Sequence, residues 1–136
     1  MFEIFEHTAD LGLRVRAADL NTLFAEAGMG LFWLMLDDLE VVQPRFSLSF
    51  DLSAPDLVDL LHDFLAELLY AFEIRKLVLC RFAVKVNGSR LHAEASGEPF
   101  DLARHAVTRE IKAITYHALS VTQLSEGWVA EVIVDI

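Results

Sequence analysis

An apolar stripe between residues 57 and 72 places the strongest restriction on how this 136-residue chain folds. Its members recur at spacings of three and four: Leu57, Leu60, Leu61, Phe64, Leu65, Leu68, Leu69 and Phe72. This spacing predicts a core helix, because it lines one face of an α-helix with side chains that need burial. Ser53 or Ala54 is expected near the cap of this helix, with Pro55 near its first position.

A second long helix is predicted from Leu20 to Leu36, where apolar residues again follow helical spacing and Asp19 stands at the N-cap position. Period-two alternation of apolar and polar residues predicts strands over 11–17, 46–52 and 76–86. Asn87-Gly88 predicts a type I′ hairpin with a return strand over 89–95 that Gly97-Glu98-Pro99 ends. A last hairpin is expected over 119–123 and 128–135, whereas 101–118 is ambiguous between helix and extended chain.

Together these elements predict an α+β fold, with mainly antiparallel β-sheets and two long helices packed on them. No repeat or Pro/Gly-rich linker divides the sequence, which has only three Pro and six Gly. We therefore expect residues 1–136 to form a single domain, which also agrees with the usual length of one domain.

The net charge and the apolar fraction together exclude several classes of protein. Asp and Glu number 21 against 11 Lys and Arg, for a net charge of −10, while 54% of the residues are apolar. An apolar fraction this high excludes a disordered acidic tail, and the acid excess argues against direct binding of nucleic acid. Because no apolar run is long enough to span a membrane and no basic signal-peptide region begins the chain, we expect a cytoplasmic protein. The lone Cys80 is expected to pack in the core.

Few residues indicate chemistry by pattern alone, since phosphate-binding loops and zinc-ligand spacings are absent from the sequence. The acidic residues Asp56, Asp59, Asp63 and Glu67 follow one side of the helix over 57–72, as a solvated face or as a docking surface for a basic partner. At the chain end, apolar residues surround Asp135 and tie it to a strand beside Ile136. Clustered carboxylates there would need a hard cation or a shared proton; the alternative is an ordinary edge strand.

Several motifs, in order, resemble those of the archease family. They are His7-Thr8-Ala9-Asp10-Leu11-Gly12-Leu13, the helical segment from Asp56 through Tyr70, Gly97-Glu98 followed by His105, the run from Glu110 to His117, and the terminal Val134-Asp135-Ile136. These motifs span nearly the whole chain. The sequence departs from the family pattern at Asp56, where Glu is commoner, at Phe64-Leu65-Ala66, and at Ala118, where Gly is common.

The resemblance implies a small α+β protein that is not itself an enzyme. It implies an activator of the tRNA-splicing RNA ligase, which uses GTP and Mn²⁺ and passes through a guanylylated histidine. It also implies a divalent-metal site formed by Asp10, Asp135 and Ile136, the last through a main-chain or terminal oxygen. His7, Glu110, Lys112 and His117 are second-rank candidates for ordering this site or its surroundings.

Oxygen ligands favour Ca²⁺ as the cation, with Mg²⁺ or Mn²⁺ as alternatives. The ligase is the expected partner, and any contact with RNA is expected only indirectly, through that ligase. Two other functions stay open on the residues: a metal-dependent phosphate-ester hydrolase with His7 or His117 as base, and a general protein chaperone.

Overall fold

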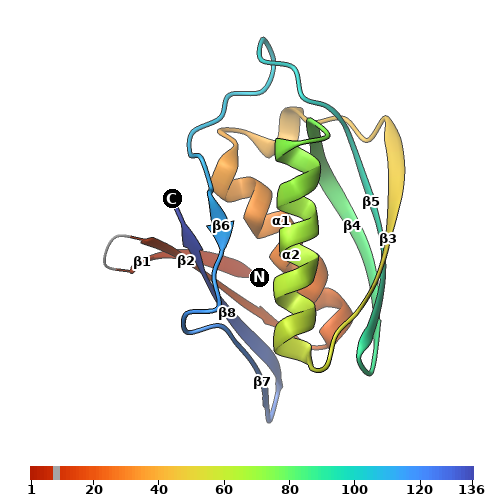
Figure 1. Ribbon diagram of the computed structural model, residues 1–136, viewed down its shortest axis with the longest axis vertical. Coiled ribbons are helices and arrows are strands. Elements are labelled where there is room, and N and C mark those ends of the chain that lie inside the picture. Colours follow the sequence, from red (N-terminus) through yellow and green to blue (C-terminus); the bar gives the residue numbers. More distant parts are fainter. Residues whose placement is uncertain (8–9) are drawn as a thin grey trace.

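The computed structural model describes residues 1–7 and 10–136, so Thr8 and Ala9 of the sequence motif, and the side chain of His7, lie outside the described part. Two antiparallel sheets enclose two helices, as predicted (Figure 1). Within the described ranges, neither helix is long and apolar enough to cross a membrane.

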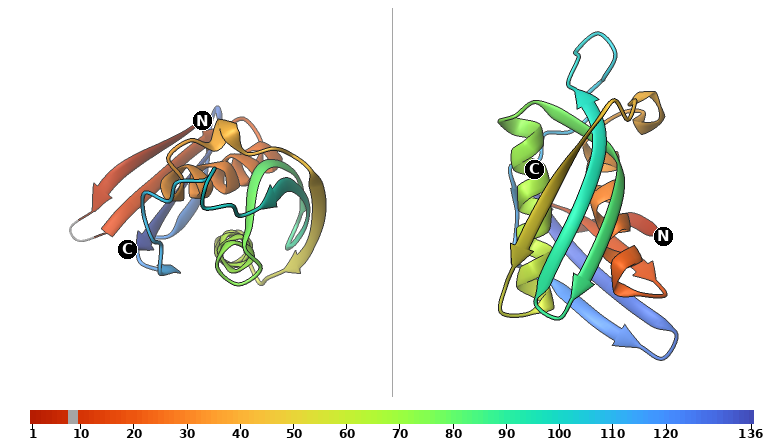
Figure 2. Two further views of the ribbon diagram at one scale, coloured as in Figure 1. Left: turned by 90° about the horizontal axis from the view of Figure 1, so that it is seen from above. Right: turned by 90° about the vertical axis from the view of Figure 1, so that its right-hand side faces the viewer.

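The first sheet joins the two ends of the described chain. Strands β1 (Phe2–His7) and β2 (Asp10–Ala17) form a hairpin, and β2 pairs along its length with β8 (Gly127–Asp135). On its other side β8 pairs with both the two-residue β6 (Ala113–Ile114) and β7 (Ser120–Leu124). This brings the C-terminus beside the end of the β1–β2 hairpin (Figure 2).

The second sheet has the order β3–β5–β4, from β3 (Phe46–Ser53), β5 (Arg90–Pro99) and β4 (Leu77–Asn87). It curves around α2 (Leu57–Glu73), while α1 (Leu20–Met35) lies between β4 and the first sheet (Figure 2). A short 3₁₀ helix, η1 (Leu39–Val41), follows α1.

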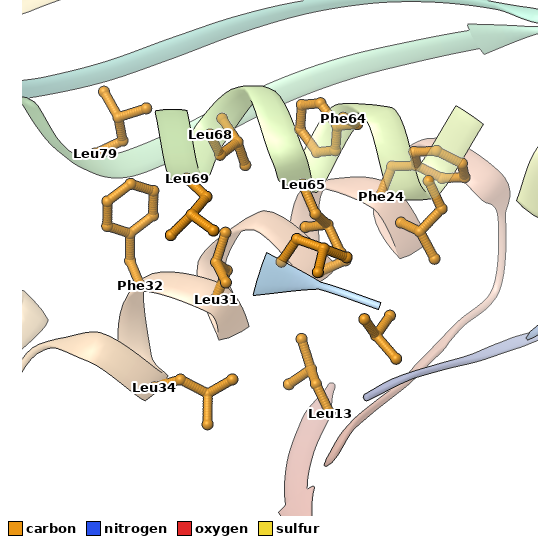
Figure 3. Packing of buried hydrophobic residues seen from close by; sticks show 14 of the residues in the cluster. Leu13, Phe24, Leu31, Phe32, Leu34, Phe64, Leu65, Leu68, Leu69 and Leu79 are labelled. Carbon is orange, nitrogen blue, oxygen red and sulfur yellow. The ribbon is translucent and has the colours of Figure 1, made fainter. Parts of the chain in front are cut away.

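The core fills the space between the helices and the two sheets (Figure 3). Phe24 and Phe32 of α1 and Phe64 of α2 are fully buried at its centre. Leu13 of β2 and Leu79 of β4 bring both sheets into the same cluster. The predicted apolar stripe of α2 is therefore confirmed as the side that holds the sheets together.

Both helices begin at aspartate caps. Asp19 Oδ1 accepts the Thr22 N–H at 2.8 Å, as expected for α1. The cap of α2 is Asp56, which accepts the Asp59 N–H at 2.9 Å, so the expectation of Ser53 or Ala54 at the cap is wrong. Ser53 is still part of β3, and Pro55 precedes the cap instead of following it.

The β4–β5 hairpin forms, but its turn differs from the prediction. Asn87 pairs with Arg90, so the two turn residues are Gly88 and Ser89. Gly88 has φ +61° and Ser89 does not have a positive φ, whereas a type I′ turn needs both positive. Strand β5 also runs through Gly97 and Glu98 to Pro99 instead of ending at Gly97, because β4 pairs with it over that whole length.

A bulge in β4 explains the environment of Cys80. The register shifts between Leu79 and Arg81, so Cys80 is the extra residue and is half-buried, packed against the core. Burial is the main cause that raises the pKa of its thiol. Cys80 therefore has the packing role that was expected, although less deeply buried than its alternation with core residues suggested.

Candidate functional site

The predicted metal ligands meet at one corner of the first sheet, where β2 begins and β8 ends. Leu11 pairs with Val134, and continuing this register places Asp10 beside Asp135. Leu11 and Val134 point into the core, so alternation directs Asp10 and Asp135 to the opposite face. Asp10 is half-buried there and Asp135 is exposed.

A third strand holds the end of β8 in place. Ala113 of β6 pairs with Asp135, and the Lys112 N–H donates to the Asp135 carbonyl at 2.7 Å. Two residues before Asp135, the Ile133 carbonyl accepts both the N–H and the hydroxyl of Thr115, at 3.1 and 2.8 Å. The end of β8, just before Ile136, is therefore held on both sides, by β2 and by the segment around β6.

The register of β2 and β8 brings two negative charges close together at the corner. Residues opposite each other on antiparallel strands have Cβ atoms about 5 Å apart, and like charges in that arrangement repel. Among the described residues, neither Asp10 nor Asp135 has an ion-pair partner. A divalent cation or a shared proton would relieve this repulsion, and carboxylate and main-chain oxygens suit a hard cation.

The ligand set that these side chains supply is small. Within the described ranges, no group of three His, Cys, Asp or Glu side chains gathers around a common point. Asp10, Asp135 and a main-chain oxygen of Ile136 would leave several coordination positions of the cation to water or to a phosphate oxygen. This composition does not suit zinc, which prefers four nitrogen or sulfur ligands in a closed site.

The second-rank candidates occupy different positions relative to Asp10 and Asp135. His7 pairs with Asp10 in the backbone register of the β1–β2 hairpin, which continues the row of Asp10 and Asp135. Lys112 is joined to Asp135 through its main chain, and its side chain is exposed. Glu110 and His117 are exposed on either side of β6.

The acidic stripe of α2 extends towards the same segment. Asp59 and Asp63 are half-buried, and Asp56 and Glu67 are exposed. Tyr116, just after β6, is 58% exposed. Partial loss of water around its hydroxyl, followed by the Asp63, Asp59 and Asp56 carboxylates, raises the pKa of Tyr116. The stripe therefore adjoins the segment that holds Asp135.

His62 is a residue near the corner that motif analysis missed. It belongs to α2 and contacts both Ile114 of β6 and Tyr116. The signal that could have found it is its place between the core stripe and the acidic stripe, where an imidazole can pack and donate at once.

A buried ionic network anchors the long segment before β6. Glu98, 1% exposed, accepts hydrogen bonds from Arg104 at 2.7 Å, from the Gln43 N–H at 2.9 Å and from His105 Nε2 at 2.9 Å. The Arg104 hydrogen bond is the main cause that lowers the Glu98 pKa, to about 2. The Asp101 N–H donates to His105 Nδ1 at 2.8 Å, so His105 is a satisfied core residue and not a metal ligand.

The same segment also completes the end of α1. The Thr108 N–H donates to the Met35 carbonyl at 2.9 Å, and Arg109 donates to the Leu34 carbonyl at 3.1 Å. The last carbonyls of a helix have no donor within the helix. Here Thr108 and Arg109 supply donors to two of these carbonyls. Residues 101–118 are therefore ordered by side-chain and main-chain contacts, with little regular structure of their own.

These features define a class of protein: a small α+β domain whose two antiparallel sheets enclose two helices and whose second and last strands bring two carboxylates to one corner. The model of the Archease protein family (MTH1598/TM1083) matches residues 2–136. The chain therefore belongs to the archease family.

Individual relatives agree over the full length. Protein archease of Methanopyrus kandleri is 39% identical over 139 residues, which cover 99% of this chain and 99% of the relative. Protein archease of Thermococcus gammatolerans is 37% identical over 140 residues, covering 99% and 98%. The solution structure of Methanobacterium thermoautotrophicum protein 1598 superposes with a TM-score of 0.86 at 30% identity, covering 99% of this chain and 98% of that one.

Proposed function

We propose that this chain activates the tRNA-splicing RNA ligase, promoting guanylylation of the ligase and its multiple turnover. Membership of the archease family supports a role of this kind. The structural observation that carries the proposal is the β2–β8 register, which pairs Leu11 with Val134 and, continued by one residue, places Asp10 beside Asp135 on the side of the first sheet away from the core. That pair offers anionic oxygens at the surface, where a second protein can reach them.

In this proposal, Asp10, Asp135 and a main-chain oxygen of Ile136 hold a divalent cation, Ca²⁺ first, with Mg²⁺ or Mn²⁺ as alternatives. The cation supplies positive charge that can neutralise phosphate oxygens. The two carboxylates bind and orient it, and the main-chain bonds from Lys112 and Thr115 keep β8 in place while they do so. Because the corner is exposed, coordination positions remain open to a partner.

The chain acts in this proposal as an activator and not as the enzyme. A surface with net charge −10 is unsuited to RNA but complements a basic protein that must itself hold RNA. Contact with RNA is therefore indirect. The acidic stripe of α2 adjoins Tyr116, just after the strand that pairs with Asp135, and is available to the same partner.

Single-turnover guanylylation of the cognate ligase, with and without this protein, tests the proposal. We expect the parent chain to accelerate the reaction and Asp10→Asn or Asp135→Asn to remove the acceleration. Glu94→Gln is the matched control, because it removes one exposed charge from the second sheet and should leave activation unchanged. Full activation by both Asp variants would overturn the role of the corner.

Two assays without ligase address the alternatives and the cation. Calorimetric titration with CaCl₂, MgCl₂ and MnCl₂ should show one site in the parent chain that both Asp variants lose. Hydrolysis of nucleotides or phosphorylated RNA ends by the chain alone would favour the hydrolase instead. Suppressed aggregation of unrelated proteins would favour the chaperone.

A further inference from the structure

The ring of His62 connects α2 to the strand that holds the carboxylate corner. Its Nε2 lies 3.2 Å from the Ile114 carbonyl oxygen. A carbonyl oxygen only accepts, so Nε2 carries the hydrogen and donates. The ring also stacks on Tyr116, with centroids 3.9 Å apart and planes at 15°, and its Nδ1 lies 3.1 Å from Asp63 Oδ1.

This contact reaches β6, the shortest strand described in the first sheet. Strand β6 has only two residues and bonds on one side to β8, through Ala113 with Asp135 and Ile114 with Val134. On its other side, the Ile114 carbonyl meets His62, whose side chain is 17% exposed. A two-residue strand is weak alone, so a second anchor decides how firmly it is held.

We propose that His62 is a positioning residue for the carboxylate corner. It fixes β6 from the helix side, and β6 in turn fixes the main chain of Asp135 against β2. The inference rests on the proposed cation site, and it assigns to α2 a part in that site in addition to its packing. His62 does not touch the cation; it limits the movement of the strand that presents a ligand.

Three substitutions separate the bond to Ile114 from the rest of the ring. In His62→Gln the side-chain amide nitrogen can occupy the place of Nε2 and still donate to the Ile114 carbonyl. In His62→Asn the amide is one carbon shorter, so it faces Asp63 but stops short of Ile114. His62→Ala removes both contacts and the stacking on Tyr116.

Calorimetric titration of each variant with CaCl₂ and MnCl₂ measures the effect without the ligase. Residues that orient a ligand typically change metal affinity by about 10-fold or more, so we expect His62→Ala and His62→Asn to bind about 10-fold more weakly. His62→Gln should recover most of the affinity. Amide exchange at Lys112 and Thr115, whose N–H groups bond to β8, should quicken in the same order.

His92→Ala is the matched control. His92 Nδ1 also pairs with an aspartate, Asp51, at 2.8 Å, but it lies on the second sheet away from the corner, so cation affinity should not change. Circular dichroism confirms that each variant is folded. Parent-like affinity in His62→Ala and His62→Asn would overturn the inference while the cation site stands. Absence of binding by the parent chain would overturn the cation site and the inference together.

Discussion

At the scale of single residues, Ala118 adopts a backbone conformation that its side chain disfavours. Its φ is +53°, in the left-handed region, where a Cβ atom is crowded. This is the position at which the sequence departs from a glycine common in the family. The chain therefore carries local strain directly after His117, at the turn that leads into β7.

Ala118→Gly should stabilise the protein by about 0.5–1 kcal/mol, because glycine adopts this conformation without steric cost. Urea unfolding followed by circular dichroism measures the gain. Ala103→Gly, at an exposed turn residue without a positive φ, should be neutral or destabilising. An Ala118→Gly variant no more stable than Ala103→Gly would show that the turn carries no strain.

Glu98 makes the stability of the fold sensitive to acid. Its pKa in the folded state is about 2, below the ordinary 4.5, so the ionised carboxylate stabilises the fold above pH 4.5. That stabilisation fades as the pH falls from 4.5 towards 2, and its full size is about 3 kcal/mol. Glu98→Gln should flatten the pH dependence of the unfolding free energy over this range.

Equilibrium urea unfolding between pH 2.5 and 7 measures that dependence. At neutral pH, Glu98→Gln should also lower stability by about 3 kcal/mol, because Arg104 loses the charge that it pairs with. An unchanged slope in the variant would place the acid sensitivity on other carboxylates.

At the scale of elements, Gly97 permits the close approach of β4 to β5 beside the bulge. A Cβ atom at this position would collide with the Val78 carbonyl oxygen and would lie 2.8 Å from the Leu79 Cα. Both obstacles are backbone atoms, so no side-chain rotation can relieve them. Gly97 thereby allows its neighbour Glu98 to reach the buried network with Arg104.

Gly97→Ala should destabilise the fold by about 3 kcal/mol, the upper part of the usual range for overpacking. Gly88→Ala is the comparison, because Gly88 has φ +61° but nothing within 4 Å of an added Cβ, and it should cost only about 1 kcal/mol. Thermal unfolding of the two variants ranks them. Equal losses would mean that β4 can move away from β5 at this point.

The elements that sequence predicted well are those with local signals. Asp19 and the apolar spacing behind it place the start of α1 correctly, because a cap and its helix are neighbours in the chain. Strand β1 lies outside the predicted elements, since Phe5 interrupts its alternation. The structure explains Phe5: its ring covers Gly12, which has no side chain, and Arg14 lies 4.6 Å above it.

The candidate site was predictable only in part. The pattern around Asp135 indicated clustered oxygens, but its partner Asp10 came from family resemblance, because pairing between β2 and β8 is not encoded by any local period. Spacing places His62 between the core stripe and the acidic stripe but does not show what its ring contacts. Its importance depends on the Ile114 carbonyl, 52 residues away, and on a strand too short to show alternation.

At the scale of the whole molecule, the acid excess opposes compaction. With a net charge of −10, self-repulsion lowers stability at low ionic strength, and salt screens it. Raising NaCl from 20 to 300 mM should therefore raise the melting temperature by about 3 °C, or about 1 kcal/mol. Scanning calorimetry in the two buffers measures the shift. A melting temperature that falls with salt would mean that attractive ion pairs outweigh the repulsion.

The pairing of β2 with β8 also determines when the corner can exist during folding. Leu11 meets Val134 only after more than a hundred intervening residues have been brought together, and contacts this distant in sequence form slowly. The β4–β5 hairpin and α2 can form early from local contacts, while we expect Asp10 and Asp135 to come together among the last steps. If the corner holds the proposed cation, a kinetic intermediate with only the second sheet ordered would not bind calcium, and calcium binding would then measure the completion of folding.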